Sequence, residues 1–179
     1  TEILEKIKEL DPDMIVVVAY GKIIPKDIID IPRLGIINLH TSLLPKYRGA
    51  SPIHTALLNG DSVTGVTVMY INEKMDEGDI ILQDKTEIED SDNYFTLYNK
   101  LSDIGKHSLL KAMELIERGE NERIPQNHIE ATYTRIIKKD DSNVDWSLSA
   151  KELYNFIRAY NPVNPSFSII NGKRVQIYE

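Results

Sequence analysis

The feature that most constrains the fold is an uninterrupted apolar run from Met14 to Ala19, rich in β-branched residues. A strand that faces water on one side alternates apolar and polar side chains, whereas a run without polar residues is typical of a strand buried on both faces of a parallel sheet. Further apolar segments at 34–39, 64–71 and 79–88 predict three more strands. Because helical patterns lie between these segments, the chain is predicted to be an α/β protein with helices layered on a sheet.

Helix boundaries follow from local capping signals. Serine is a favoured N-cap, proline fits the first helical position, and glycine supplies the left-handed exit from a helix. These signals predict a short helix opened by Pro25, a helix from Ser51-Pro52 to Asn59-Gly60, a long helix capped by Ser91-Asp92 that stops at Gly119, and a helix from Ser149 to Tyr160. The spacing of the apolar residues predicts a further helix over residues 1–10, which ends before Asp11-Pro12. The predicted inward positions of the last two helices are Leu97, Leu101, Ile104, Ala112 and Leu115, and Leu153, Phe156 and Ile157.

The chain ends in a predicted β-hairpin. Ser166–Ile170 and Arg174–Tyr178 read as two strands joined by Asn171-Gly172, the strongest short-range signal for a hairpin. An isolated hairpin is marginally stable in water, so we expect it to begin a small β-domain. The predicted organisation is a partial core over 1–125, a polar and irregular linker over 126–147, and the start of a C-terminal domain over 148–179.

Composition indicates a globular chain without cysteine chemistry. Hydrophobic residues make up 41% and charged residues 27%, and there is no cysteine, which excludes disulfides, thiolate nucleophiles and cysteine-based zinc sites. No apolar run approaches the ~20 residues of a membrane span. Nor does a basic and apolar leader precede the first helix. We therefore expect a cytoplasmic protein without a membrane partner.

Charge is distributed unevenly along the chain. The net charge is −7. Residues 1–120 contain 13 basic and 21 acidic side chains and so carry −8, whereas residues 121–179 contain 8 basic and 7 acidic side chains and carry +1. Basic pairs at Lys138-Lys139 and Lys173-Arg174 could let the tail approach a polyanion. Ordinary scatter of surface charge explains the same numbers, and composition alone favours that interpretation.

Two polar residues at the end of the second predicted strand are candidates for catalysis. Asn38 and His40 lie at the carboxyl end of a buried strand, where open α/β sheets build their binding crevices. Their spacing of two puts both side chains on one side of the strand. An amide that donates and an imidazole that exchanges protons could together hold an oxyanion during acyl transfer. Capping or core packing explains the pair about equally well.

An acidic loop, 72–79, separates the third and fourth predicted strands, with Gly78 expected to provide its turn. Such carboxylates are usually solvated. A carboxylate that faces a histidine instead fixes its tautomer and orders an attacking nucleophile.

Taken in order, these motifs resemble one family. Asn38-x-His40, then Ser-Leu-Leu-Pro, Arg-Gly, Gly-Val-Thr and Met75-Asp76-x-Gly78, is similar to the folate-dependent formyltransferases, whose members act on methionyl-tRNA, glycinamide ribonucleotide or amino sugars. The resemblance covers almost the whole chain. It implies a Rossmann-like sheet with flanking helices, followed by the start of an OB-like β-domain. It also implies that Asn38, His40 and Asp76 form the catalytic trio.

The resemblance further implies how substrates bind. The segment from Ala19 to Pro25 resembles the loop whose backbone receives the pterin ring of the formyl donor, 10-formyltetrahydrofolate, and no metal is implied. The donor-binding residues it implies are Ala19, Tyr20, Gly21, Ile23, Ile24, Ser42, Leu43, Leu44 and Pro45.

The segments after residue 130 resemble family members that act on methionyl-tRNA, notably Val144-Asp145-Trp146-Ser147 and Ile157 to Pro162. Methionyl initiator tRNA is thus the implied partner, and the full-length protein is expected to be a monomer. In the implied reaction the acceptor amine attacks the formyl carbon, Asn38 and His40 stabilise the oxyanion, protons pass through His40, and Asp76 orients His40 or an ordered water.

The chain also departs from the family. Family members begin with further α/β units, so an opening segment and most of the C-terminal domain are expected to be missing, leaving residues 16–18 as an exposed apolar edge. Val163 to Ser166 stands where the family usually has an aromatic residue followed by proline and glycine. Arg48 is equally compatible with contacting a substrate and with bracing its own loop.

Four alternative functions remain open for these residues. A formyltransferase for an amino sugar nucleotide or another small amine would change only the acceptor, and a hydrolase that releases formate would use water instead. A metal hydrolase built on His40, His54 and Asp76 is disfavoured because the two histidines lack a helical ligand spacing. A non-catalytic folate-binding fragment would bind the donor without turnover.

Overall fold

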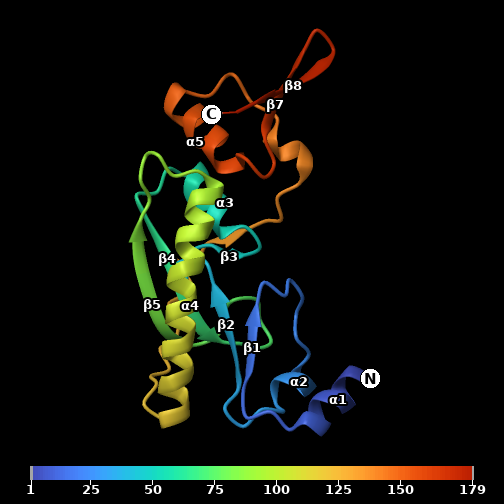
Figure 1. Ribbon diagram of the computed structural model, residues 1–179, viewed down its shortest axis with the longest axis vertical. Helices are drawn as coiled ribbons and strands as arrows, with labels where there is room; N and C mark the ends of the chain where they lie inside the picture. Colours follow the sequence, from blue (N-terminus) through green and yellow to red (C-terminus); the bar gives the residue numbers. More distant parts are fainter. Residues whose placement is uncertain (1, 179) are drawn as a thin grey trace.

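The computed structural model describes residues 2–178, which fold around one four-stranded sheet (Figure 1). The helices are α1 (Glu2–Leu10), α2 (Lys26–Ile29), α3 (Pro52–Leu58), α4 (Tyr94–Arg118) and α5 (Ala150–Tyr160), with short 3-10 turns at His128–Glu130 and Lys139–Ser142. The strands are β1 (Ile15–Val18), β2 (Ile36–His40), β3 (Arg48–Gly49), β4 (Val63–Tyr70), β5 (Ile80–Glu87), β6 (Tyr133–Thr134), β7 (Ser166–Ile170) and β8 (Lys173–Ile177).

The main sheet has the order β1-β2-β4-β5 and is mixed. β1 runs parallel to β2, whereas β4 is antiparallel to both β2 and β5. The predicted α/β class is confirmed. The prediction that 14–19 is buried on both faces is wrong. Met14, Ile15 and Val17 are only half-buried, Ala19 is exposed, and Val16 and Val18 are 38% and 54% exposed. The reason is that β1 lies at the edge of the sheet in the described residues, which confirms the expected apolar edge.

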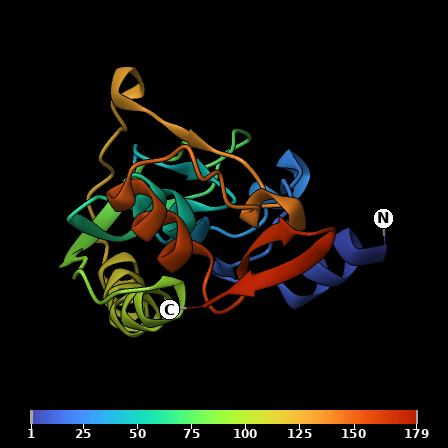
Figure 2. The ribbon, with the colours of Figure 1, turned by 90° about the horizontal axis from the view of Figure 1, so that it is seen from above.

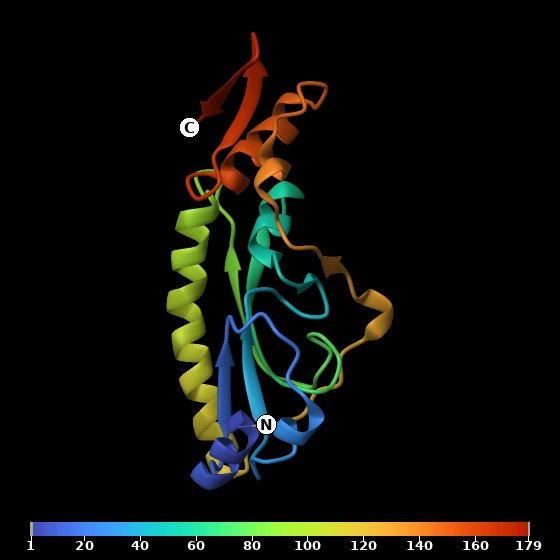
Figure 3. The same cartoon turned by 90° about the vertical axis from the view of Figure 1, so that its right-hand side faces the viewer.

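Helix α4 runs along one face of the sheet and closes the core there, while the loops that follow β2 and β4 lie on the other face (Figure 3). Leu97 and Leu101 are fully buried, as predicted, and pack with α3 and β4 in one apolar cluster. Of the other predicted positions, Ala112 is fully buried, and Leu115 is only half-buried because Ile116 takes the inward place beside it. This arrangement leaves the face opposite α4 for polar side chains.

The helix caps follow the predicted chemistry at some ends and not at others. α4 is capped by Asn93, whose side chain accepts from two backbone amides, and not by Ser91-Asp92. Ser51 occupies the N-cap position of α3, but its side chain makes no capping hydrogen bond. Ser149 caps α5 as expected, and Gly119 ends α4 at φ 68°.

Helix α5 docks on α3 and on the first turn of α4 (Figure 2). Its predicted inward residues Leu153, Phe156 and Ile157 are only half-buried. The buried contact is made instead by the last turn, where Arg158 is 3% exposed and donates to the carbonyls of Glu89 and Asp92. The apolar periodicity of α5 did not indicate this buried face, because the residue at its centre, Arg158, is charged.

The C-terminal hairpin of β7 and β8 forms as predicted. Asn171 and Gly172 take φ values of 50° and 75°, the positive values that a two-residue turn of this type needs.

Residues 126–147 contact the core at a few positions and are otherwise mostly exposed. Gln126, Ser142 and Val144 are buried, and β6 pairs in parallel with β3. This pairing brings the segment beside the loop that follows β2. No helix within residues 2–178 has the combination of length and apolar character that a membrane span requires.

Candidate active site

Strand β2 presents Asn38 and His40 on the face away from α4. Leu39 points to α4, where Gly105 leaves room for it: a Cβ at that glycine would lie 2.7 Å from Leu39 Cδ2. Because side chains alternate along a strand, Asn38 and His40 point to the opposite face. Asn38 is half-buried and His40 is 7% exposed.

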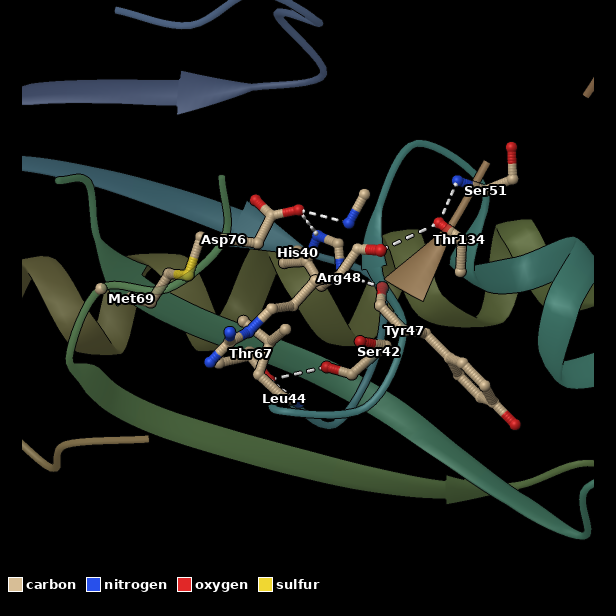
Figure 4. Close-up of polar contacts among 12 residues, drawn as sticks. His40, Ser42, Leu44, Tyr47, Arg48, Ser51, Thr67, Met69, Asp76 and Thr134 are labelled. Carbon is tan, nitrogen blue, oxygen red and sulfur yellow. Dashed lines mark hydrogen bonds and ion pairs between the residues drawn. The ribbon is translucent and has the colours of Figure 1, made fainter. Parts of the chain in front are cut away.

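The two ring nitrogens of His40 have different partners (Figure 4). Nε2 lies 2.9 Å from the carbonyl oxygen of Tyr47, and since a carbonyl only accepts, Nε2 carries the proton of the neutral ring. Nδ1 then holds the free lone pair and lies 3.6 Å from Oδ2 of Asp76. This separation is longer than a direct hydrogen bond. The pair can accept from a donor placed between them, and Asp76 can stabilise the imidazolium once Nδ1 takes a proton.

Asp76 is held in position by the backbone of β3. Its Oδ2 accepts from the amide of Gly49 at 2.7 Å, and its side chain is 16% exposed. Asp76 itself has φ 54°, a left-handed conformation that is uncommon for a residue other than glycine. Gly78 was expected to provide this turn and does not. It is required for another reason, since a Cβ there would lie 1.7 Å from the carbonyl oxygen of Tyr70.

Arg48 is fully buried and contacts several segments that surround the site. Its Nη1 lies 3.1 Å from Oε1 of Glu77, and its Nε and Nη2 donate to Oε1 of Gln126 at 3.0 and 2.7 Å. Nη1 also donates to the hydroxyl of Tyr133. With no exposed surface, these three hydrogen bonds and the ion pair, Arg48 joins the loops after β2 and β4 to residues 126–133. Of its two possible roles, the structure therefore supports bracing.

The residues expected to bind the formyl donor fall into two segments with different environments. Tyr20 and Ile23 are 57% and 72% exposed in the loop after β1, and Ala19 and Gly21 there have φ values of 53° and 68°. Ile24 is half-buried.

The second segment, 42–45, is packed into its own loop. Ser42 is fully buried and its hydroxyl donates to the carbonyl of Lys46, while Leu44 is 3% exposed. Leu43 and Pro45 are half-buried.

Several residues that build the site were not predicted from the sequence. Gln126 and Tyr133 lay in a segment expected to be a linker, and their partner Arg48 is distant in the sequence. Thr67 lies within the Gly-Val-Thr motif and is fully buried; its hydroxyl donates to Ser42 O and accepts from Leu44 N. Its place in that motif was the only signal, and it did not indicate this role.

The alternative of a metal hydrolase has no support in the structure. Residues 2–178 contain no group of three or more histidine, aspartate and glutamate side chains that could hold a metal ion. His54 instead contacts the rings of Tyr94 and Tyr160, at centroid distances of 4.1 and 5.8 Å.

With this geometry in place, sequence comparison identifies the family. A family model described as formyl transferase matches residues 1–113, and a model of the formyl transferase C-terminal domain matches residues 136–179. The chain belongs to the formyl transferase family. A curated relative from Fusobacterium nucleatum, named methionyl-tRNA formyltransferase, is 48% identical over 177 residues, which cover 99% of this chain and 57% of the relative. The chain thus spans little more than half the length of this formyl transferase.

Solved structures of formyl transferases and related proteins share the fold. A likely sugar N-formyltransferase from Mycobacterium tuberculosis superimposes with a TM-score of 0.85 at 23% identity, covering 99% of this chain and 77% of the other. HypX from Aquifex aeolicus, solved in complex with tetrahydrofolic acid, superimposes with a TM-score of 0.83 at 21% identity, covering 99% of this chain and 31% of the other.

Proposed function

We propose that this chain carries the catalytic core of a formyltransferase that moves a formyl group from 10-formyltetrahydrofolate to the amino group of methionyl initiator tRNA. The acceptor is supported by the printed name of the relative that is 48% identical, and by the match to the C-terminal domain of the family.

The observation that carries the proposal is the environment of His40. The Tyr47 carbonyl fixes the proton on Nε2, so Nδ1 is left as the base, and the carboxylate of Asp76 lies 3.6 Å beyond it. In this arrangement His40 accepts the proton that the attacking amine loses, and Asp76 stabilises the charge that results. When the tetrahedral intermediate collapses, the bond between the formyl carbon and the donor nitrogen breaks, and His40 returns the proton to that nitrogen as tetrahydrofolate leaves. Asn38, on the same face of β2, donates from its amide to the formyl oxygen as negative charge develops there.

The loop after β1 has the properties that a donor-binding loop needs. A Cβ added at Gly21 would meet no atom within 4 Å, so there is open space beside this backbone. The exposed side chains of Tyr20 and Ile23 offer apolar surface to a flat ring. The donor supplies the activated formyl carbon; Ala19 to Ile24 and the backbone of 42–45 are proposed to hold it beside His40.

The test is formyl transfer from 10-formyltetrahydrofolate to methionyl initiator tRNA, comparing the chain with Asp76→Asn. Asparagine keeps an oxygen that can accept from the Gly49 amide but removes the charge, so the loop is preserved and kcat is expected to fall roughly 10²-fold or more. Glu73→Gln, in an exposed part of the same loop, is the matched control and is expected to retain full activity.

An amino sugar nucleotide is offered as a competing acceptor. Formylation of the sugar without formylation of the tRNA would contradict the proposed acceptor. Equal activity of Asp76→Asn and the parent chain would contradict the role of Asp76. Donor binding without transfer to either acceptor would show that the catalytic core is incomplete in this chain.

A further inference from the structure

The side chain of Gln126 connects the two loops that meet at His40. It is 6% exposed, and its Nε2 donates to the carbonyl oxygens of Asp76 and Gly78 at 2.9 and 2.8 Å. Its Oε1 accepts from Nε and Nη2 of Arg48. A single amide thus holds the backbone of the acidic loop with its two N–H groups and is itself held by a buried guanidinium.

The chemistry of this position is specific to an amide. Arg48 only donates, so the atom that faces it must be an acceptor, and the two carbonyls only accept, so the group that faces them must donate. Glutamine meets both requirements at once, and its orientation is therefore fixed by its neighbours. Arg48 cannot turn away, because it is fully buried and its Nη1 is bound to Glu77 and Tyr133.

Asp76 needs such support because its conformation is unfavourable on its own. A left-handed φ in a residue other than glycine costs about 1–2 kcal/mol and persists only where the surroundings impose it. The outer part of the loop, Asn72 to Met75, is exposed and offers little restraint. The carbonyl that Gln126 binds belongs to Asp76 itself, so this contact acts on the residue whose carboxylate faces His40.

We propose that Gln126 is a positioning residue for catalysis, which holds the backbone at 76–78 so that the carboxylate of Asp76 stays aligned with His40 and with the amide of Gly49. Its catalytic consequence rests on the proposed function, since it acts through Asp76. Gln126 touches neither reacting group, and its effect is on the alignment that the proton transfer requires.

The first part of the test reads the position of Asp76 without using activity. The Gly49 amide donates to the Asp76 carboxylate, so its proton shift and its hydrogen-exchange rate, measured by NMR, report whether the carboxylate is in place. In Gln126→Glu the acceptor for Arg48 is kept, but an oxygen replaces the N–H groups that face the two carbonyls. The Gly49 amide is expected to shift toward its position in Asp76→Ala and to lose exchange protection, while the α4 amides stay unchanged.

Two further variants control this measurement. Gln176→Glu makes the same substitution on the exposed strand β8 and is expected to leave the Gly49 amide unchanged. Gln126→Met has a similar length without charge or donors, and it replaces Gln126→Glu if the latter does not fold. An unchanged Gly49 amide in the folded Gln126 variants would overturn the proposal whatever their activity.

The second part of the test is kinetic. Misalignment of a catalytic group by about 1 Å can cost about 100-fold in rate. We therefore expect Gln126→Glu to lower kcat by about 10- to 100-fold with little change in KM for donor or acceptor. Because Gln126 acts through Asp76, the same substitution should have little further effect in the Asp76→Asn background, whereas a purely structural role would add to it.

The outcomes separate this proposal from the proposed function. A displaced Gly49 amide with undiminished kcat, in a protein where Asp76→Asn is impaired, would overturn the positioning role. The Gly49 amide could also be displaced while formyl transfer depends on neither Asp76 nor Gln126. That result would support the contact by which Gln126 positions Asp76, and it would contradict the catalytic function proposed for Asp76.

Discussion

The two sides of the candidate site differ in how firmly the chain holds them. On the side of His40, the groups proposed to handle protons are held firmly: His40 is 7% exposed, the carboxylate of Asp76 is fixed by a backbone amide, and the bracing residue Arg48 is fully buried. On the side of β1, the loop expected to receive the donor has Tyr20 and Ile23 more than half exposed. The side proposed to handle protons is therefore held in place by the chain itself, whereas the side proposed to bind the donor, here called the donor side, keeps exposed apolar surface.

The difference follows from the kinds of interaction that each side uses. Buried polar groups are costly when unpaired, so a network of them either has every partner or destabilises the fold. An exposed loop carries no such constraint and tolerates change. Substitutions on the two sides should consequently differ in their effects on stability, which can be measured directly.

The largest effect is expected from Arg48→Leu. It removes a buried cation and leaves Glu77 and Gln126 without the partner that both have in the native fold. Breaking a buried ion pair costs about 3–5 kcal/mol, so the free energy of unfolding in urea should fall by that amount. Arg33→Leu is the control. Its pair with Asp13 is exposed, and its loss should cost less than about 1 kcal/mol. Equal losses would contradict the proposed difference between buried network and surface.

The same substitution, glycine to alanine, can be made on each side of the site and its effects on stability compared. In Gly78→Ala the new Cβ would lie 1.7 Å from the Tyr70 carbonyl oxygen, so backbone must move, at a cost of about 1–3 kcal/mol. In Gly21→Ala nothing lies within 4 Å, and only the φ of 68° is unfavourable for alanine, at about 1 kcal/mol. We further expect formyl transfer to be impaired in Gly78→Ala more than stability alone explains, because the carbonyl of Gly78 is one that Gln126 binds. Thermal unfolding of the two variants measures the first difference, and kcat the second.

Local features of the fold were predictable from the sequence, and long-range pairings were not. Gly119, Ser149 and Asn171-Gly172 act within a few residues of themselves, so their signals identified two helix ends and a turn. The antiparallel pairing of β2 with β4 brings together strands that are distant along the chain, and apolar patterns do not specify it. Apolar patterns likewise did not indicate that Val16 and Val18 are exposed. Only the resemblance to longer family members, which predicts a sheet edge at this strand, indicated it.

The site was predictable where chemistry is concentrated in short motifs. Asn38, His40 and Asp76 could be selected because they stand in recognisable segments, and the structure brings His40 and Asp76 within 3.6 Å. Their catalytic roles stay a prediction. Gln126 was missed because its partners are 50 and 78 residues away, and a buried glutamine between two loops leaves no periodic signal.

A half-buried histidine, His54, extends the comparison to pH. Burial lowers the pKa of His54 to about 4, below its ordinary value of 6.5. Its ring neighbours Tyr94 and Tyr160 have their pKa raised by burial, so they stay neutral and provide no compensating charge. Between pH 6.5 and about 4 the unfolded chain binds the extra proton, so stability should fall as pH is lowered through this window.

The slope is at most about 1.4 kcal/mol per pH unit, and it is smaller because the ring is partly exposed. Urea unfolding at several pH values measures it. His54→Phe keeps an aromatic ring and should remove this component, whereas His107→Gln, on the exposed face of α4, should leave it. A slope that persists in His54→Phe would assign the effect to another group.

The smallest effect is expected at the open edge of β1. Val18 is 54% exposed, so Val18→Thr keeps the β-branched shape and should change the free energy of unfolding by no more than about 0.5 kcal/mol. Val68→Thr, in the fully buried centre of β4, is the matched control and should cost about 1–3 kcal/mol because it buries a hydroxyl. An apolar edge promotes pairing between chains, so Val18→Thr should also reduce concentration-dependent association in sedimentation experiments. If Val18→Thr instead destabilises the chain as much as Val68→Thr, β1 is covered in solution and the donor side is as closed as the side that holds His40.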